Sequence, residues 1–535
     1  MKHDQGRRIL LKIKYYKMLL IFLLSISLAG CGLAGAAKDR KTLIIGIESE
    51  TDVLDPHRAG GWVTFRVNYQ IHESLVTEDL STSNEKTPPL KPGLAEKWSV
   101  SEDGLTYTFH LRKGVEFHDG TPFNSKAVEF NIRRAWDKDF EYYDTRSAGQ
   151  LASTYQNLKE VKVIDDYEIE LVMDQPFAPF LRMLAQGGMG SGGILSPAAL
   201  KMWGNDGYAE HPSGTGPFKF IERVRGEKIV LDANENYWGK KPHIDRVIFR
   251  PIPDPATRVL ALESGEVDII SVPPPDSVKV LKEKGFKVVD GNVPHVWYLA
   301  LNMRNKEMQN RKVREAISLA IDREGMAEEL LQKTVTPAKS VLSPANEAYE
   351  ENFNGYEYNP EKAKKLLKEA GYPDGFDTVF RTSVDGSGQL IPVQMAEWIQ
   401  RDLEKIGINV KIETYEWISY LGVFYQEAPE QIGFSQMSWG MSTPYILSIM
   451  AQSDSGSNPG KYHNNEVDQL IENAVTETDN GTSNEYWRLA NKKVTQDRGI
   501  VGVVNDKAPY AISEDVEGFI VPNEEWFSLI DVNLK

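Results

Sequence analysis

The sequence has 535 residues and a formal net charge of −16 at pH 7, with 61 Lys and Arg residues against 77 Asp and Glu residues. Such an acidic chain argues against nucleic acid as a partner, because phosphates attract basic surfaces. The hydrophobic share of 41% and the aromatic share of 10% exclude intrinsic disorder. The length exceeds what a single hydrophobic core supports, so we expect two or three domains.

The start of the chain, residues 1–30, has the pattern of a secretory signal peptide. A basic stretch precedes an apolar run that begins at Met18 and ends in Leu28-Ala29-Gly30-Cys31. The run alone is also compatible with a membrane anchor helix, but small residues directly before a cysteine favour cleavage. The last four residues resemble the bacterial lipobox, whose cysteine receives a diacylglycerol and becomes the new N-terminus. We therefore expect a lipid on Cys31 and a linker over residues 31–41.

The cysteine count supports a lipid anchor. Cys31 is the only cysteine in the sequence, so an internal disulfide is excluded and the thiol needs another explanation. Lipid attachment supplies one, because two or more acyl chains give stable anchoring. The expected location is therefore extracytoplasmic, at the outer face of the cell membrane or in the periplasm.

Strands and helices alternate after the linker. Residues 42–47 form a short apolar run typical of a buried strand, and residues 105–111 alternate with the period of a half-buried strand. Residues 168–172 and 247–251 have similar patterns, and residues 408–412 and 378–380 are further expected strands. These segments predict a protein of the α/β class, with a mixed α+β arrangement.

Helices are clearest in the second half. Apolar side chains recur at helical spacing over residues 313–321 and residues 467–474, which predicts two amphipathic helices. Asn359 and Pro360 suit the N-cap and first turn of another helix, which Gly371 ends. A fourth helix is expected over residues 395–406, before a glycine. These apolar stripes predict core packing.

Motifs of catalysis and of cofactor binding are nearly absent. A Gly-x-Gly-x-x-Gly match at residues 188–193 follows a helix-like stretch instead of a strand, which favours a loop over a dinucleotide site. The histidines are scattered and are expected at the surface, and only His110 and His118 are close in sequence. We therefore expect no enzyme, no cofactor and no metal site built from protein ligands.

Ordered motifs along the chain carry a family resemblance. The stretch from Gly93 to Phe123 contains Trp98, the Asp103-Gly104 turn and His118-Asp119-Gly120, and it is similar to the signature of family 5 solute-binding proteins. These are the peptide- and nickel-type binding proteins of ABC importers. Further motifs follow in the order of the family, and they are Leu54-Asp55-Pro56, Gly214-Thr-Gly216-Pro217, Asn236-Tyr-Trp238-Gly239, Ala261 to Asp268, Val313 to Arg323, Tyr358 to Tyr372 and Met395 to Gln400.

The resemblance implies a two-lobed fold like that of periplasmic binding proteins, with a hinge and an extra third subdomain. Lobe one is expected to be discontinuous, the extra subdomain to span residues 86–211, and lobe two to span residues 296–507. The expected segments of lobe one are residues 38–85, 212–295 and 508–535. The resemblance also implies a monomer whose lobes close on a small solute and which delivers that solute to the permease and ATPase subunits of an ABC importer. Gly214 and Gly216 are expected to permit tight backbone geometry where regions meet.

The solute is less clear from the sequence. In peptide-binding members an aspartate soon after a tryptophan pairs with the peptide α-amino group; here Trp439 is present, but Ser442 or Thr443 stands at the expected place of the aspartate. A neutral hydroxyl lacks the charge-assisted bond that an ammonium prefers. In nickel-type members an arginine binds the anionic chelate, and the corresponding segment 186–193 has none.

Several functions stay open. The first is capture of a peptide or peptide-like compound, and the alternative is capture of nickel or another metal chelate. Other amphipathic solutes, such as sugars or opines, and a signalling receptor without transport are further readings. An anchored hydrolase would need a nucleophile and base that the sequence does not reveal.

Six residues are candidates for ligand contact. Trp439 could stack on the solute or fill the core, and Arg381, after an expected strand, could bind a carboxylate or be a solvated surface arginine. Trp62 could face the cleft from lobe one. The remaining three are chosen by position only, and they are Ser442, Thr443 and Tyr445.

Overall fold

The computed structural model describes residues 41–83, 86–185, 192–386 and 388–535. Within that part of the chain, Thr42–Lys535 forms one compact unit. The expected signal peptide, the lipid site at Cys31 and most of the glycine-rich segment 188–193 lie outside the described residues, so the predictions made for them stay predictions. Among the residues that are described, no helix has the length and apolar character needed to cross a membrane.

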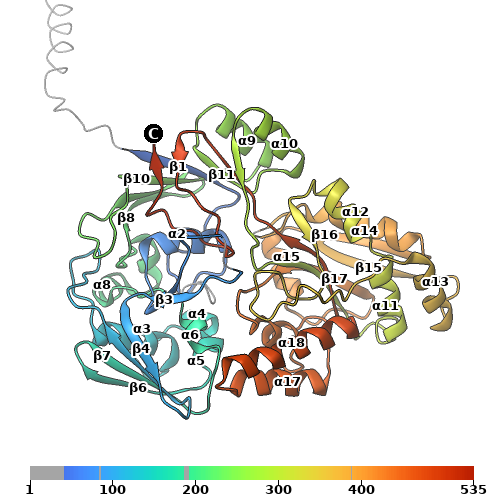
Figure 1. Ribbon diagram of the computed structural model, residues 1–535, viewed down its shortest axis with the longest axis horizontal. Coiled ribbons are helices and arrows are strands. Elements are labelled where there is room, and N and C mark those ends of the chain that lie inside the picture. Colours follow the sequence, from blue (N-terminus) through green and yellow to red (C-terminus); the bar gives the residue numbers. More distant parts are fainter. Residues whose placement is uncertain (1–40, 84–85, 186–191, 387) are drawn as a thin grey trace, which may run out of the picture. The chain divides into compact units, whose positions relative to one another are not determined.

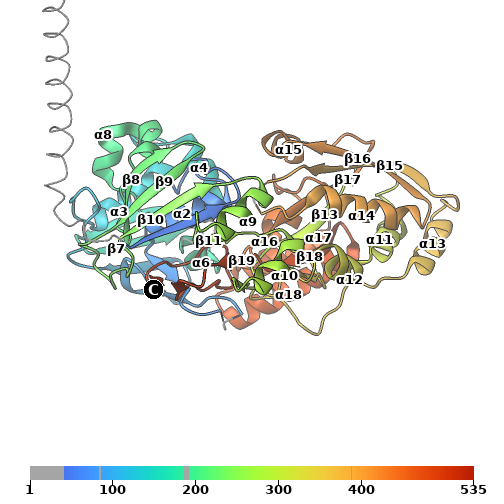
Figure 2. The ribbon, with the colours of Figure 1, turned by 90° about the horizontal axis from the view of Figure 1, so that it is seen from above.

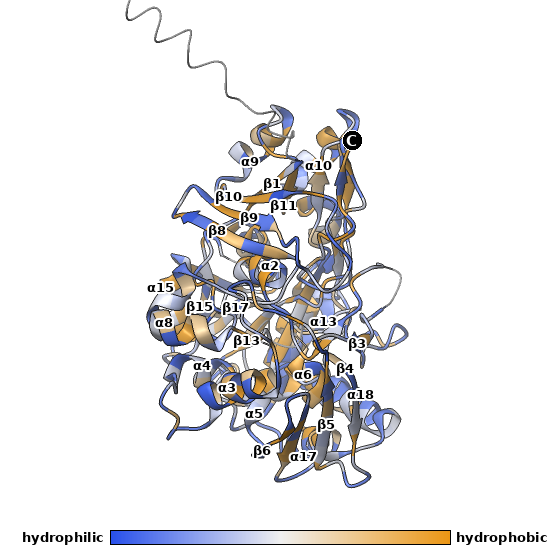
Figure 3. Cartoon of the chain, turned by 90° about the vertical axis from the view of Figure 1, so that its left-hand side faces the viewer, coloured by the Kyte–Doolittle hydropathy of each residue, from blue (hydrophilic) through white to orange (hydrophobic). Residues whose placement is uncertain are grey.

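The first structural layer is a seven-stranded sheet in the order β12-β19-β11-β1-β10-β9-β8 (Figure 1). Strand β1 runs parallel to its neighbours β10 and β11, and the other pairs are antiparallel. The strands are β1 Thr42–Ile47, β8 Phe218–Val224, β9 Lys228–Ala233, β10 Arg246–Pro251, β11 Ile269–Ser271, β12 Lys287–Val289 and β19 Tyr510–Ile512. In the hydropathy colouring of Figure 3, β9 and β10 are largely hydrophobic.

Helices cover both faces of this sheet. Alternate residues of β1 point to opposite faces: Leu43 and Ile45 pack with Val67 of α2, whereas Ile44 packs with the cluster that contains Leu262 of α9 and Leu281 of α10. The three helices are α2 Trp62–Ile71, α9 Pro255–Glu263 and α10 Pro275–Glu283. Burial on both faces explains why residues 42–47 form a continuous apolar run.

A second, four-stranded antiparallel sheet has the order β4-β5-β7-β6. Gly104 has a φ of 69° in the turn between β4 and β5, as expected for an Asp-Gly hairpin. The strands are β4 Ala95–Val100, β5 Thr106–Leu111, β6 Leu158–Asp165 and β7 Glu168–Met173, and a separate pair is formed by β2 Val76–Glu78 and β3 Leu90–Pro92. The helices in this part of the chain are α3 Ser125–Trp136, α4 Thr145–Gln150, α5 Ala152–Tyr155, α6 Phe180–Leu184 and α8 Pro197–Gly207.

A third, six-stranded sheet has the order β14-β18-β13-β17-β15-β16, with β15 parallel to both β16 and β17 (Figure 2). Its strands are β13 Val296–Leu301, β14 Val335–Pro337, β15 Phe376–Ser383, β16 Ile408–Tyr415, β17 Ile432–Trp439 and β18 Ile500–Asp506. Its helices are α11 Arg311–Ala320, α12 Arg323–Gly325, α13 Pro360–Glu369, α14 Pro392–Glu404, α15 Trp417–Phe424, α16 Ile446–Ala451, α17 Asn465–Thr476 and α18 Asn480–Asp497. The mixed sheets and surrounding helices confirm the predicted α/β class.

The predicted helices begin and end where their sequence signals stand. The Asn359 side chain accepts a hydrogen bond from the backbone N–H of Lys362, and Pro360 is the first residue of α13. The helix ends before Gly371, which has a φ of 94°. The apolar stripes of α11, α14 and α17 are buried in one shared core. Capping and amphipathicity therefore agree with the fold.

Two segments connect the seven-stranded sheet to the six-stranded sheet, and they lie side by side. One passes from β12 to β13 and the other from β18 to β19. The backbone N–H of Gly291 donates to the carbonyl of Lys507 over 3.0 Å, and that of Asp506 donates to His295 over 3.2 Å. Ala508 has a φ of 39°, an uncommon value for alanine. Paired crossing segments of this kind are where a hinge would bend.

The glycines of the Gly214-Thr-Gly216 motif stand at a close backbone approach, as predicted. A Cβ atom on Gly214 would lie 2.1 Å from the carbonyl oxygen of Ile71, and one on Gly216 would lie 2.7 Å from that of Gln70. Only glycine fits at such distances. This motif therefore fixes the entry to β8 against the end of α2.

Candidate functional site

Glu78, the last residue of β2, lies at a contact between distant segments of the chain. One carboxylate oxygen, Oε1, accepts from Arg182 Nη1 over 3.0 Å and from Ser442 Oγ over 3.3 Å, while Oε2 accepts from Trp526 Nε1 over 3.1 Å. The side chain of Glu78 is fully buried and that of Arg182 is 11% exposed. Ser442 follows β17 of the six-stranded sheet. Glu78 therefore joins β2 and α6 to the segment that follows β17 of the six-stranded sheet.

Glu524 is a second buried carboxyl group beside Glu78. The residue is 2% exposed. Its Oε1 accepts from the backbone N–H of Glu525 over 3.0 Å, and its Oε2 has no hydrogen-bond partner. Burial raises the pKa of Glu524 well above its ordinary value, and the nearby charge of Glu78 raises it further. Burial likewise raises the pKa of Glu78, although the charge of Arg182 opposes the shift.

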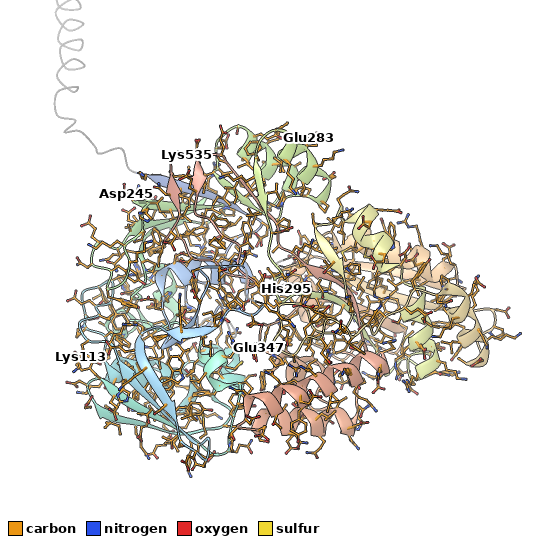
Figure 4. The ribbon with its side chains drawn as sticks, in the orientation of Figure 1. Lys113, Asp245, Glu283, His295, Glu347 and Lys535 are labelled. Carbon is orange, nitrogen blue, oxygen red and sulfur yellow. The ribbon has the colours of Figure 1, made fainter. Side chains whose placement is uncertain are left out.

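Further polar contacts surround the buried pair. Arg182 Nη2 pairs with Glu347 Oε1 at 2.5 Å. Lys86 Nζ donates to the carbonyl of Tyr349 over 2.7 Å, and Thr87 Oγ1 donates to that of Ala345 over 2.6 Å. Figure 4 shows Glu347 and His295 in the central region, between the blue-green and the orange parts of the chain. The segment after β2 and helix α6 are thereby both joined to the segment after β14.

Trp62, a predicted ligand contact, lies among aromatic rings at the same junction. Its ring centroid is 4.9 Å from that of His295 and 6.0 Å from that of Trp526, onto which it stacks. A Cβ atom on Gly388 would lie 2.7 Å from Cε1 of His295 and 3.3 Å from Cδ1 of Trp62. Trp526 connects Trp62 to Glu78 through its indole hydrogen bond. The structure thus places Trp62 and Ser442 around one carboxylate–tryptophan pair.

A second buried charge cluster lies next to Trp62, and one guanidinium pairs with both of its carboxylates. Arg66 pairs with Glu48 Oε1 at 2.7 Å and with Glu525 Oε2 at 2.9 Å. Glu48 Oε2 accepts from Ser271 Oγ over 2.5 Å, whereas Glu525 Oε1 lies 3.3 Å from His295 Nε2 without a hydrogen bond between them. Burial opposes ionisation of Glu48, but the charges and hydrogen bonds of its partners lower its pKa overall.

The other predicted residues after β17 divide between two environments. Thr443 is buried beside Ser442. The hydroxyl of Tyr445 accepts from Gln156 Nε2 over 2.9 Å, and its ring meets Phe177 edge-on at 5.5 Å. Tyr445 therefore contacts the part of the chain built on the four-stranded sheet.

Trp439 and Arg381 lie on the six-stranded sheet. Trp439 is the last residue of β17, opposite Val296, and is partly buried against the core. Arg381, on β15, is 12% exposed and lies 3.9 Å from Glu413. Its Nε has no hydrogen-bond partner. Arg381 is therefore not a solvated surface arginine, and its guanidinium keeps hydrogen-bonding capacity.

The histidines do not follow the prediction of surface positions. His57, His72 and His295 are buried, and burial lowers the pKa of His57 to about 4 and that of His72 to about 3. His57 contacts the carbonyl of Gly193, and His72 contacts the hydroxyl of Tyr208. Internal polar partners allow these rings to be buried. In the described part of the chain, no three His, Cys, Asp or Glu residues are grouped to hold a metal ion.

Sequence reasoning missed the two central carboxylates. Glu78 ends a short Leu-Val-Thr-Glu segment, and Glu524 belongs to an acidic pair before Trp526 and Phe527. Glutamates are rarely buried without a partner, so a surface position was the natural expectation for both. The one available signal was the aromatic pair directly after Glu524 and Glu525, which marks the segment as part of a core.

Comparison with known proteins extends this description. The family profile described as bacterial extracellular solute-binding proteins, family 5 Middle, matches residues 89–461. The chain is 30% identical over 515 residues to the dipeptide-binding protein of Escherichia coli K12. The aligned region covers 91% of this chain and 93% of the relative. The chain is 31% identical over 472 residues to heme-binding protein A of Haemophilus influenzae, covering 85% of this chain and 86% of the relative.

A solved structure shows the same fold. The periplasmic binding protein DppA of Helicobacter pylori, in complex with the peptide STSA, superposes with a TM-score of 0.80 at 29% identity, covering 92% of this chain and 98% of that one. It is an ABC-transporter-associated protein. The match to the family over most of the length, with the two-lobed fold, means that this chain belongs to the family 5 bacterial extracellular solute-binding proteins, the substrate-capturing components of ABC importers.

Proposed function

We propose that this protein captures a peptide or peptide-like solute between its two lobes and delivers it to the permease of an ABC importer, without a catalytic step. The observation that carries the proposal is the buried contact among Glu78, Ser442 and Trp526, where both lobes supply polar groups. The relatives named for dipeptide binding and the neighbour bound to STSA support the choice of solute. A shared fold alone would not fix the ligand.

In this proposal the lobes are those expected from the sequence. Lobe one comprises residues 38–85, 212–295 and 508–535, the extra subdomain residues 86–211, and lobe two residues 296–507. The paired crossing segments around Gly291 and Lys507 serve as the hinge. Ligand that binds both lobes favours the closed state because only that state offers all of its contacts.

The predicted site residues take complementary roles. Arg381 binds a carboxylate of the solute. In support, its side chain is mostly buried and its Nε has no hydrogen-bond partner. Trp62 and Trp439 supply apolar walls, supported by the partial burial of both. Ser442 and Thr443 provide hydroxyl groups at the junction, and Tyr445 holds the extra subdomain against lobe two through Gln156.

We further propose that the mature protein is a monomer, anchored by a lipid on Cys31 and tethered through residues 31–41. The signal pattern and the unique cysteine support this. Metabolic labelling with a radioactive fatty acid tests it: wild type incorporates the label, and Cys31→Ala does not. Label on the variant would contradict the anchor.

A thermal-shift screen tests the proposed solute. The panel contains di- to octapeptides, glutathione, and nickel with and without histidine, added to protein purified from cells that export it. A ligand that binds only the native state stabilises it by about 2.7 kcal/mol at one hundred times its dissociation constant. A shift with peptides supports the proposal. A shift only with nickel and histidine favours a metal chelate, and no shift with any peptide contradicts the proposal.

Trp439→Ala tests the site within that screen. We expect the variant to keep the unfolding temperature of the ligand-free protein within a few degrees and to bind the responding peptide more than tenfold more weakly, about 1.4 kcal/mol. Unchanged affinity would assign Trp439 to the core alone.

A further inference from the structure

We infer that Ala508 is a strained pivot in the hinge, which favours the open state of the ligand-free protein and limits how tightly the solute is held. This inference rests on the proposed function and deepens it, because it assigns the control of solute binding to one residue. The described conformation is the closed one, in which Glu78 of lobe one contacts Ser442 of lobe two. Thr87 of the extra subdomain likewise donates to the carbonyl of Ala345.

Anchored residues on both sides confine the rotation of the crossing segment that leaves β18. Asp506 is the last residue of β18 and belongs to the six-stranded sheet. The carbonyl of Pro509 accepts from the backbone N–H of Val272, which follows β11 of the seven-stranded sheet, over 2.9 Å. Lys507 and Ala508 lie between these anchors. The change of backbone angles on opening of this segment therefore falls on these two residues.

The anchor at Val272 is fixed within lobe one. Arg258 of α9 is 3% exposed, and its Nη2 donates to the carbonyl of Val272 over 2.9 Å. The Nε of Arg258 donates to the carbonyl of Ser271 over the same distance. Val272 has a φ of 45°, an outlier for a β-branched residue. Because the bonds to Arg258 lie within one lobe, this strain is the same in the open and closed states.

The strain at Ala508 lies in the moving part. Its φ of 39° is in the left-handed region, where the Cβ of an L-residue crowds the following carbonyl oxygen. Pro509 follows, and a residue before a proline prefers extended backbone. Asp506 Oδ1 accepts from the backbone N–H of Ala508 over 2.8 Å, and Ala508 is 3% exposed. This bond and the surrounding packing hold Ala508 in a conformation that its sequence disfavours.

Strain that is present only in the closed state shifts the equilibrium between the two states. When the lobes separate, rotation at Lys507 and Ala508 returns Ala508 to extended backbone. The ligand-free protein therefore populates the closed state less, and the apparent dissociation constant rises as the competent fraction falls. Contacts with the solute must offset the strain before the lobes stay closed. The pivot thus weakens binding and favours release of the solute to the permease.

Ala508→Gly tests the pivot, because glycine adopts a positive φ freely. We expect at least threefold tighter binding of the panel peptide that gives the largest thermal shift, measured by isothermal titration calorimetry. We also expect the ligand-free variant to have a smaller radius of gyration than ligand-free wild type in small-angle X-ray scattering, because more of it is closed. The second measurement needs no peptide.

Lys461→Gly is the matched control. Lys461 has a φ of 53°, but it lies between α16 and α17 within lobe two, so its strain is the same in both states. Its side chain contributes little, since the exposed pair with Glu427 is 3.9 Å long. Glycine at this position should leave both the peptide affinity and the radius of gyration unchanged.

The outcomes separate the two proposals. Unchanged peptide affinity in Ala508→Gly overturns the strained pivot and leaves the peptide function standing. An equal gain in Lys461→Gly also overturns the pivot, because the effect would then be independent of the hinge. If folded wild type binds no peptide of the panel, the proposed function fails. The scattering of the ligand-free Ala508→Gly protein then decides the pivot by itself, and a radius of gyration equal to that of wild type overturns it.

Discussion

Two buried charge clusters lie within a few residues of each other, and they differ in one respect. In the cluster of Arg66, Glu48 and Glu525, one buried guanidinium pairs with both carboxylates. In the cluster of Glu78 and Glu524, Arg182 pairs with Glu78, and the contacts of the described residues include no cation for Glu524. The pKa of Glu48 is accordingly lowered, whereas that of Glu524 is raised. Burial alone therefore does not decide whether a carboxyl group ionises, because its partners decide the direction of the shift.

The largest effect is expected at the Arg66 cluster. Arg66→Met leaves two buried carboxylates without their cation, which should lower the free energy of unfolding by about 3–5 kcal/mol. Urea denaturation of the ligand-free protein measures it. The control is Lys279→Ala, since the pair of Lys279 and Glu283 is exposed and 3.9 Å long, and its loss should cost less than about 1 kcal/mol. Similar values for both variants would remove the distinction.

A smaller effect is expected when the cluster of Glu78 and Glu524 receives a third acid. Ser442→Asp places another carboxylate beside Glu78, and we expect the free energy of unfolding at pH 7 to fall by roughly 1–3 kcal/mol. Combining it with Glu524→Gln should restore at least half of the loss, because one acid has been exchanged for another. Strict additivity in this double-mutant cycle would mean that the two side chains do not interact.

The smallest effect concerns pH. Burial raises the pKa of Asp506, at the end of β18, to about 7. Asp506 therefore keeps its proton in the folded protein between about pH 4 and 7, where the same carboxyl is ionised in the unfolded chain, so its own contribution to stability falls as pH rises through this range. Asp506→Asn keeps the acceptor for the N–H of Ala508, and its urea-unfolding midpoint should rise relative to that of wild type from about pH 4 to 7. A difference between variant and wild type that does not change with pH would contradict the assignment.

The sequence predicted the fold better than the site, for physical reasons. The start of α13 at Asn359 and Pro360, and the apolar stripe of α11, depend on residues that are neighbours along the chain. The two-lobed arrangement followed from the family resemblance. By contrast, the contact of Glu78 with Ser442 joins residues 364 positions apart. No local pattern reports such a contact, and glutamates in short polar segments look like surface residues.

The same limit explains the histidines. His72 and His295 were expected at the surface because the histidines are scattered along the sequence, without nearby partners. The structure buries them against distant groups, the hydroxyls of Tyr208 and Ser438. Conversely, Ser442 was selected only by its position after Trp439, and the structure places it against a carboxylate that the sequence did not connect to it.

The most direct test of the central claim, capture of a peptide or peptide-like solute, is native mass spectrometry. Exported wild-type protein is incubated with the panel of di- to octapeptides and, separately, with nickel and histidine, and the bound masses are compared with those on Trp439→Ala. Capture of a peptide predicts that wild type carries a peptide mass and that the variant carries less of it. Folded wild-type protein that carries no peptide would contradict the claim.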